Sequence, residues 1–180
     1  MRLKLHPDSR CEAVNGIDVS VLRESTGDLL LEFQASGDPD QFIPDWRSEP
    51  RPKPKRTDDL WKHTCFEAFV KPAGGEGYFE FNFAPSCQWA AYRFSGYRRD
   101  RQDADIDARP EGVMNGAGLF YLRARLALAR LPDLAGSWRL GLAAVIEEAN
   151  GRISYWALAH PPGRADFHQT DGFALELPAI

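Results

Sequence analysis

The chain has 180 residues, of which 43% are hydrophobic and 27% are charged, and its formal net charge at pH 7 is -4. This length and composition suit one domain with a substantial core, whereas the mild acidity argues against a nucleic-acid partner. The sequence shows neither a signal peptide nor an apolar run long enough to span a membrane, so we expect a cytoplasmic protein without a membrane partner.

Segments of alternating apolar and polar residues, separated by turn residues, recur along the chain. They predict strands at 17–23, 29–35, 64–95 (a three-stranded meander), 119–128, 138–147, 152–159 and 173–177. This spacing predicts one all-β domain over residues 1–180: an antiparallel β-sandwich of immunoglobulin-like or jelly-roll type with long irregular loops.

Three features refine this prediction. Residues 122–130 are rich in helix formers, but the strict alternation from Phe120 to Leu128 favours a strand. Asn150-Gly151 indicates a two-residue hairpin turn. The segments 36–60 and 96–118 are expected to be long irregular loops, a kind of segment that often borders a binding site.

The meander, between Thr64 and Ser95, decides which side chains share a face. Pairing Glu67 with Glu80 in the first hairpin sends six apolar side chains to one face: Phe66, Ala68, Val70, Phe79, Phe81 and Phe83. A slip of one residue would divide this set between the two faces. We therefore expect both glutamates on the opposite, polar face.

A turn at Ser86-Cys87 then pairs Glu80 with Arg93 and brings Asn82 and Trp89 to the same face. The expected result is an open patch of charge. Directly opposed carboxylates, roughly 5 Å apart at Cβ, destabilise a sheet unless something compensates. The repulsion between the two carboxylates could be compensated by Arg93, by a ligand's hydroxyl groups, by a cation or by a shared proton.

Aromatic and imidazole side chains complete the candidate site. Flat sugar faces stack on tryptophan while carboxylates and amides bind the hydroxyl groups, and Trp61 and Trp89 are the stacking candidates. His63, His160 and His168 are further ligand-binding candidates. Because these histidines do not occur at metal-motif spacing, no zinc site is expected.

The remaining motifs do not support a cofactor. Asp103, Asp105 and Asp107 resemble the start of an EF-hand, but Ala108 and Met114 stand where glycine and glutamate are required. A calcium site of another kind, or haem held by Met114 and a histidine, stays open as an alternative. We expect no cofactor.

Three runs of sequence carry a family resemblance: 60–70 (LWKHTCFEAFV), 78–92 (YFEFNFAPSCQWAAY) and 155–162 (YWALAHPP). The chain resembles bacterial DOMON-like proteins related to type 9 carbohydrate-binding modules. The resemblance implies a β-sandwich that binds sugars between tryptophans, or haem in other relatives. Five residues match strand positions of this pattern: Glu67, Glu80, Asn82, Trp89 and Arg93. Cys87 departs from it, since glycine is common there.

Three hypotheses follow. The leading one is a non-catalytic module that binds a carbohydrate or another small polar ligand on a sheet face or in a cleft. The alternative is a protein-interaction scaffold or dimerisation domain, with a homodimer as the partner state. The third is a glycosidase-like enzyme using Glu67 and Glu80, because carboxyl groups about 5 Å apart suit a retaining mechanism.

Overall fold

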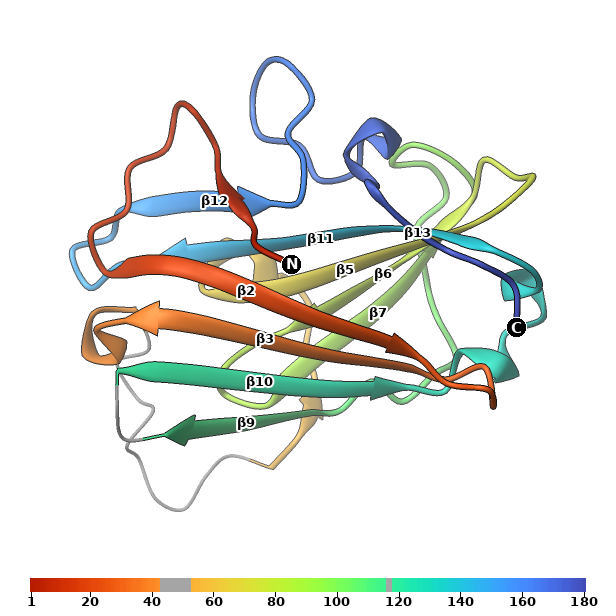
Figure 1. The fold of residues 1–180 in the computed structure, drawn as a ribbon, viewed down its shortest axis with the longest axis horizontal. Coiled ribbons are helices and arrows are strands. Elements are labelled where there is room, and N and C mark those ends of the chain that lie inside the picture. Colours follow the sequence, from red (N-terminus) through yellow and green to blue (C-terminus); the bar gives the residue numbers. More distant parts are fainter. Residues whose placement is uncertain (43–52, 116–117) are drawn as a thin grey trace.

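The structure is a computed structural model that describes residues 1–42, 53–115 and 118–180. In this part of the chain two sheets pack face to face as a β-sandwich, so the predicted fold class is confirmed (Figure 1). The described residues contain no α-helix. Their short 3-10 turns are η1 (Pro39–Gln41), η2 (Leu60–Lys62), η3 (Leu128–Arg130), η4 (Pro132–Leu134) and η5 (Thr170–Gly172). No helix among them is long and apolar enough to cross a membrane.

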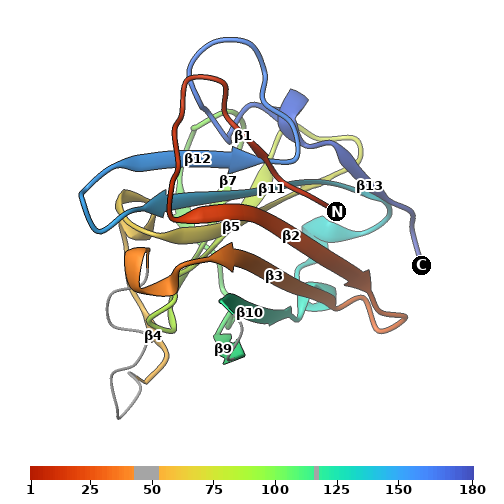
Figure 2. The same cartoon turned by 60° about the vertical axis from the view of Figure 1, so that its left-hand side comes forward.

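The larger sheet has the spatial order β1 (Lys4–Leu5), β12 (Ile153–Ala157), β11 (Trp138–Glu147), β5 (Cys65–Pro72), β6 (Tyr78–Phe83), β7 (Gln88–Phe94) and β4 (Lys55–Arg56). β13 (Leu175–Leu177) also pairs with β11, and β8 (Gln102–Asp103) pairs with β7. β4 pairs parallel with β7, and the other pairs are antiparallel. Figure 2 shows the short strands β1 and β4 at opposite margins of this sheet.

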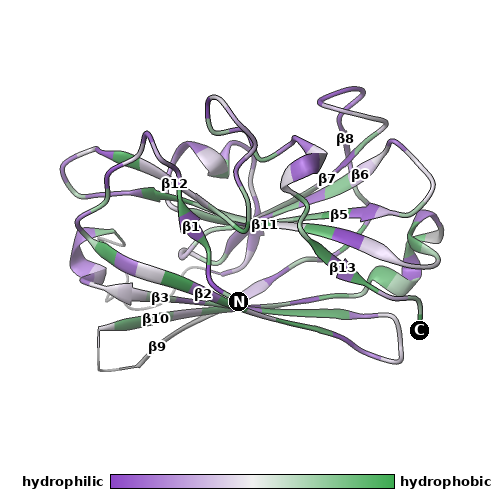
Figure 3. Cartoon of the chain, turned by 45° about the horizontal axis from the view of Figure 1, so that its top comes forward, coloured by the Kyte–Doolittle hydropathy of each residue, from purple (hydrophilic) through white to green (hydrophobic). Residues whose placement is uncertain are grey.

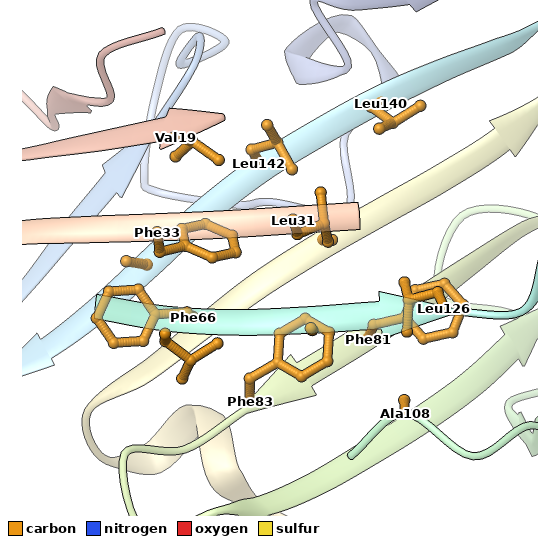
Figure 4. Packing of buried hydrophobic residues seen from close by; sticks show 14 of the residues in the cluster. Val19, Leu31, Phe33, Phe66, Phe81, Phe83, Ala108, Leu126, Leu140 and Leu142 are labelled. Carbon is orange, nitrogen blue, oxygen red and sulfur yellow. The ribbon is translucent and has the colours of Figure 1, made fainter. Parts of the chain in front are cut away.

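The smaller sheet has the order β2 (Val14–Arg23), β3 (Leu29–Gly37), β10 (Leu119–Leu126) and β9 (Pro110–Asn115). It forms the second layer, seen below the larger sheet in Figure 3. The apolar positions of both sheets alternate inward and meet in one core, where Phe33, Phe66 and Leu142 are almost fully buried (Figure 4). Period-two alternation is therefore what places the two sheets face to face.

In the first hairpin of the meander, the side chains lie on the predicted faces, but the residues pair with different partners across the strands. Glu67 pairs with Asn82, and Glu80 pairs with Phe69, so the register is shifted by two residues from the prediction. Because side chains alternate with period two, a shift of two leaves every side chain on its expected face. The two glutamates are diagonal neighbours instead of directly opposed.

The predicted register of the second hairpin is wrong by one residue. The structure pairs Phe83 with Trp89 and Glu80 with Tyr92, because Pro85, Ser86 and Cys87 together form the connection. Cys87 adopts a left-handed conformation at φ 64°, as a connection of this length requires at its last residue. A shift of one residue reverses the faces of the whole of β7.

Three other predictions from the sequence can be compared with the structure. The strand predicted at 119–128 is present as β10, but it ends at Leu126, and Leu128 begins the 3-10 turn η3. A hairpin at Asn150-Gly151 joins β11 to β12, but its connection has three residues instead of the predicted two, because Glu148 pairs with Arg152; Gly151 ends the connection at φ 81°. The segment 96–118 is not wholly irregular, since β8 and β9 lie within it; Pro110 and Gly112 in β9 interrupt the alternation that marks a strand in sequence.

A second apolar cluster covers the outer face of the larger sheet, on the side away from the core. Gly141 in β11 allows Phe173 to pack there: a Cβ atom at Gly141 would lie 2.6 Å from Phe173 Cδ1. Phe173 is fully buried and stacks on Phe69 at 5.6 Å between ring centres. The segment that carries Phe173 is therefore held directly on the sheet.

Gly141→Ala is expected to lower the free energy of unfolding by about 1–3 kcal/mol, because the Phe173 ring must move in a packed environment. Urea unfolding monitored by fluorescence measures this change. Gly75→Ala is the matched control, since the nearest atom to a Cβ there is 4.0 Å away. Equal stability of Gly141→Ala and the wild type would contradict this close packing.

Candidate functional site

A row of buried polar side chains crosses the outer face of the larger sheet. Glu67 from β5, and Glu80 and Asn82 from β6, alternate with the core-facing phenylalanines and point away from the core. They are 3%, 4% and 0% exposed, respectively. The expectation of an open patch is therefore corrected, because loops of the same chain cover this part of the face.

Only some of the polar atoms in this row form hydrogen bonds with the described residues. Asn82 Nδ2 donates to Glu80 Oε1 at 2.6 Å, and the Cys65 thiol donates to Asn82 Oδ1 at 3.5 Å. Glu67 Oε1 is buried and accepts no hydrogen bond from the described residues. A buried carboxyl oxygen without a donor is costly, so this atom is a site where a ligand's hydroxyl group would gain most.

His168 connects the row to the covering loops. Its Nδ1 lies 2.7 Å from the Tyr78 hydroxyl, which also accepts a hydrogen bond from the Arg98 backbone N–H at 3.2 Å. Its Nε2 lies 3.7 Å from Glu80 Oε2. Burial raises the pKa of Tyr78 to about 12, so its hydroxyl group stays protonated at pH 7. In the tautomer whose Nδ1 accepts from this hydroxyl group, Nε2 carries the ring proton on the side of Glu80.

Burial shifts the pKa values of these groups in the directions that favour their neutral forms. Desolvation raises the pKa of Glu80 to about 7 and lowers that of His168 to about 4. Desolvation, followed by repulsion from Glu80, holds the pKa of Glu67 well above its usual value. Because His168 is neutral at pH 7, its contact with Glu80 is not an ion pair.

An aromatic wall stands beside the row. Tyr92 of β7 points to the same side as Glu80, its neighbour across the strands, and Trp61 of η2 packs edge-to-face on it at 6.1 Å between ring centres. The Tyr92 hydroxyl donates to Asp58 at 2.5 Å. The Arg101 guanidinium lies 4.9 Å from the centre of the Tyr92 ring. This wall has an apolar surface and a charged edge.

Asp166 joins two of the covering loops. Its carboxylate accepts hydrogen bonds from the Tyr97 hydroxyl, from the Arg98 guanidinium at 2.8 Å and from the His168 backbone N–H at 3.1 Å. The hydrogen bonds it accepts lower the pKa of Asp166 in spite of its partial burial. The loop before β8 and the loop after β12 are thereby fixed to each other beside Glu80.

Two predicted site residues lie on the other side of the sheet. Trp89 belongs to the core cluster and is 8% exposed, with the Arg56 guanidinium 5.3 Å from its ring centre. Arg93 shares its face and pairs with Asp133 at 2.8 Å. The one-residue change of register explains both positions. The row expected from Glu67, Glu80 and Arg93 is thus reduced to its two acids.

The other predicted residues lie at different distances from the row. Trp61 and His168 border it. His63 is exposed and pairs with Glu147 at 2.6 Å, at the end of β11. His160 Nε2 donates to the Lys4 carbonyl at 2.8 Å, at the margin near β1. Part of the irregular segment predicted at 36–60, residues 43–52, lies outside the described residues.

Several side chains of the site were absent from the prediction: Cys65, Tyr78, Tyr92, Arg98, Arg101 and Asp166. Tyr78 and Tyr92 follow from the alternation of β6 and β7 once the register is right. The other four come from a strand end or from loops. In the part of the chain described here, no cluster of histidine, cysteine and acidic residues has the geometry of a metal site.

The fold has known relatives in structure. No protein-family model and no curated protein matches the sequence. A candidate carbohydrate-binding protein from Bacteroides uniformis superposes with a TM-score of 0.58 and 13% identity, covering 87% of this chain and 75% of the other. A family 9 carbohydrate-binding module from Caldicellulosiruptor kristjanssonii, in complex with glucose, superposes with a TM-score of 0.54 and 12% identity, covering 95% and 78%. The chain therefore has the fold of family 9 carbohydrate-binding modules.

Proposed function

We propose that this protein is a non-catalytic module that binds a carbohydrate in the covered site over Glu67, Glu80 and Asn82. The observation that carries the proposal is the buried Glu67 Oε1, which accepts no hydrogen bond from the described residues. It lies in one row with Glu80 and Asn82, and the aromatic wall adjoins Glu80. Sugars present hydroxyl donors along the rim of an apolar ring face, which matches this combination of acceptors and aromatic rings. Structural likeness to two carbohydrate-binding proteins supports it.

The roles of the residues follow from their positions. Glu80 and Glu67 would accept hydrogen bonds from sugar hydroxyl groups, with Asn82 fixing Glu80 through its amide. Trp61 and Tyr92 would contact the ring, and His168 Nε2 would donate to a hydroxyl oxygen. Because the Tyr78 hydroxyl and the Asp166 carboxylate hold His168 in place, this donor is already oriented before the ligand arrives.

The covering of this face weakens the scaffold alternative. A protein partner needs a surface that it can reach, whereas Glu80 and Asn82 are buried beneath segments of the same chain. Phe173 and Trp61 pack on this face, and Asp166 holds the loops together. A second sheet or a flat partner cannot approach the row while these segments cover it.

Calorimetric titration with neutral and acidic mono- and disaccharides at millimolar concentration tests the proposal. Glu80→Gln is expected to weaken the binding of the best sugar at least about tenfold, because a charge-assisted hydrogen bond contributes about 1.5–3 kcal/mol. Glu76→Gln, an exposed acid paired with Arg99, is the control and should bind as the wild type does. Absence of saturable heat with every sugar, or equal binding by Glu80→Gln, would refute the proposal.

A glycosidase-like reaction through Glu67 and Glu80 predicts a different result. Such an enzyme would release the aglycone from an aryl glycoside, and Glu80→Gln would abolish turnover. A binding module releases none while it still binds the sugar. An assay of the same preparation with nitrophenyl glycosides separates the two.

A further inference from the structure

The arginines of the loop between β7 and β8 differ in their partners. Arg98 pairs with Asp166 at 2.8 Å, and Arg99 pairs with Glu76 at 2.6 Å. Arg101 is exposed and forms no ion pair with any described residue. In a chain of net charge -4, an arginine left without an acid beside a binding site is a free cation for a ligand.

The guanidinium of Arg101 is held in place without being neutralised. Its central carbon lies 4.9 Å from the ring centre of Tyr92 and 5.7 Å from that of Trp61. Stacking on aromatic faces uses the flat side of the guanidinium and leaves its N–H groups free along the edge. That edge is the part that binds a carboxylate through two parallel hydrogen bonds.

Arg101 and the acid row are close enough to act on one ligand. Tyr92, which Arg101 covers, is the direct cross-strand partner of Glu80. Arg101 also acts electrostatically on Glu80, in the direction that lowers the pKa of that carboxyl group. Glu80 and the free guanidinium of Arg101 thus both adjoin Tyr92.

We propose that this site, if it binds carbohydrate as inferred above, takes an acidic sugar whose carboxylate pairs with Arg101 while its hydroxyl groups bind Glu80 and Glu67. A ligand of this class is complementary at both ends, whereas a neutral sugar leaves Arg101 without a partner. A carboxylate matches the planar edge of one guanidinium. A phosphate dianion would bring a second negative charge toward the buried acids, with no second unpaired arginine in this loop to balance it.

The test is a set of calorimetric titrations at low salt with glucuronate, galacturonate, their parent sugars glucose and galactose, and glucose 6-phosphate. We expect one uronate to bind about tenfold or more tightly than its parent sugar. Arg101→Gln should remove this advantage. Arg99→Gln, on the same loop, should retain the advantage. Added salt should reduce it.

Four results would overturn the assignment. They are equal or weaker binding of both uronates compared with their parent sugars, an advantage that persists in Arg101→Gln, tighter binding of glucose 6-phosphate than of either uronate, and absence of binding by any sugar. The last result would also refute carbohydrate binding. The first, with saturable and Glu80-dependent binding of a neutral sugar, would leave carbohydrate binding intact and remove only the acidic class.

Discussion

Glu80→Gln is expected to gain about 3 kcal/mol of stability over the wild type between pH 4.5 and pH 7.5. The pKa of Glu80 is about 7 in the folded protein against an ordinary value of 4.5. Between these values the unfolded chain has released the proton that the folded chain still binds, so the contribution of Glu80 to the free energy of unfolding falls as pH rises, by about 1.4 kcal/mol per unit. Glutamine carries no such proton.

Urea unfolding of the wild type and Glu80→Gln, from pH 4.5 to pH 8, measures the difference. Its change with pH is the relevant quantity, because the substitution also alters the hydrogen bond with Asn82. Glu76→Gln, at a side chain that is 80% exposed, should track the wild type within about 0.5 kcal/mol. Parallel curves for Glu80→Gln and the wild type would show that Glu80 is not desolvated.

His168→Gln is expected to protect the protein against acid by about 3 kcal/mol. Burial, assisted by Arg98, lowers the pKa of His168 to about 4 from 6.5. Between these values the unfolded chain binds a proton that the folded chain excludes, so the contribution of His168 to the free energy of unfolding falls as pH falls from 6.5 to 4. His168→Gln has no imidazole to protonate, so the difference in the free energy of unfolding between the variant and the wild type should grow as pH falls from 6.5 to 4.

Acid unfolding curves of His168→Gln and the wild type, followed by near-ultraviolet circular dichroism, test this expectation. His63→Gln is the matched control, because His63 is exposed and its contact with Glu147 lies away from the row. An unchanged difference between His168→Gln and the wild type from pH 6.5 to 4 would mean that His168 is accessible to protons in the folded state.

The two effects oppose each other in the wild type. Between pH 4.5 and 6.5, Glu80 destabilises the fold with rising pH while His168 stabilises it by a similar amount. The wild-type stability should therefore be nearly level in this interval with respect to these two groups. The slopes emerge only in the single variants, which is why the two substitutions are informative together.

These groups cost stability and yet form the centre of the site. Glu67 Oε1 accepts no hydrogen bond from the described residues, and Glu67 repels the nearby carboxyl group of Glu80, so apolar side chains of similar size would pack there at lower cost. Groups with strongly shifted pKa values are characteristic of functional sites, where stability is often traded for activity. A gain in stability together with a loss of binding in Glu80→Gln would be the signature of such a trade.

Alternation was sufficient to predict the strands and the outward direction of the acids. The face of Glu67 and Glu80 depends only on period two, and the apolar residues at alternate positions fix it strongly. The face of β7 depends instead on the length of one turn. Cys87 adopts a left-handed conformation at φ 64°, which a sequence without glycine at this position does not predict. The longer turn that results places Trp89 and Arg93 on the core side of the larger sheet.

The covering of the row could not be predicted from local patterns. It results from loop segments far apart in the chain, tied by contacts such as those of Asp166 with Arg98 and Tyr97. Arg98 and Asp100 adopt left-handed conformations, at φ 52° and 50°, which shape the loop over Tyr78. Such contacts depend on tertiary packing, and neither propensity nor spacing encodes them.

The most direct test of the binding site is a carbon-13 NMR titration of the glutamate side-chain carboxyl groups, with and without a saturating sugar. In the free protein, the Glu80 resonance should titrate near pH 7 and that of Glu67 well above its ordinary range. Bound hydroxyl groups stabilise the carboxylates, so both pKa values should fall on saturation. Ordinary pKa values for both groups in the free protein, or resonances that no sugar shifts, would contradict a carbohydrate site at this row.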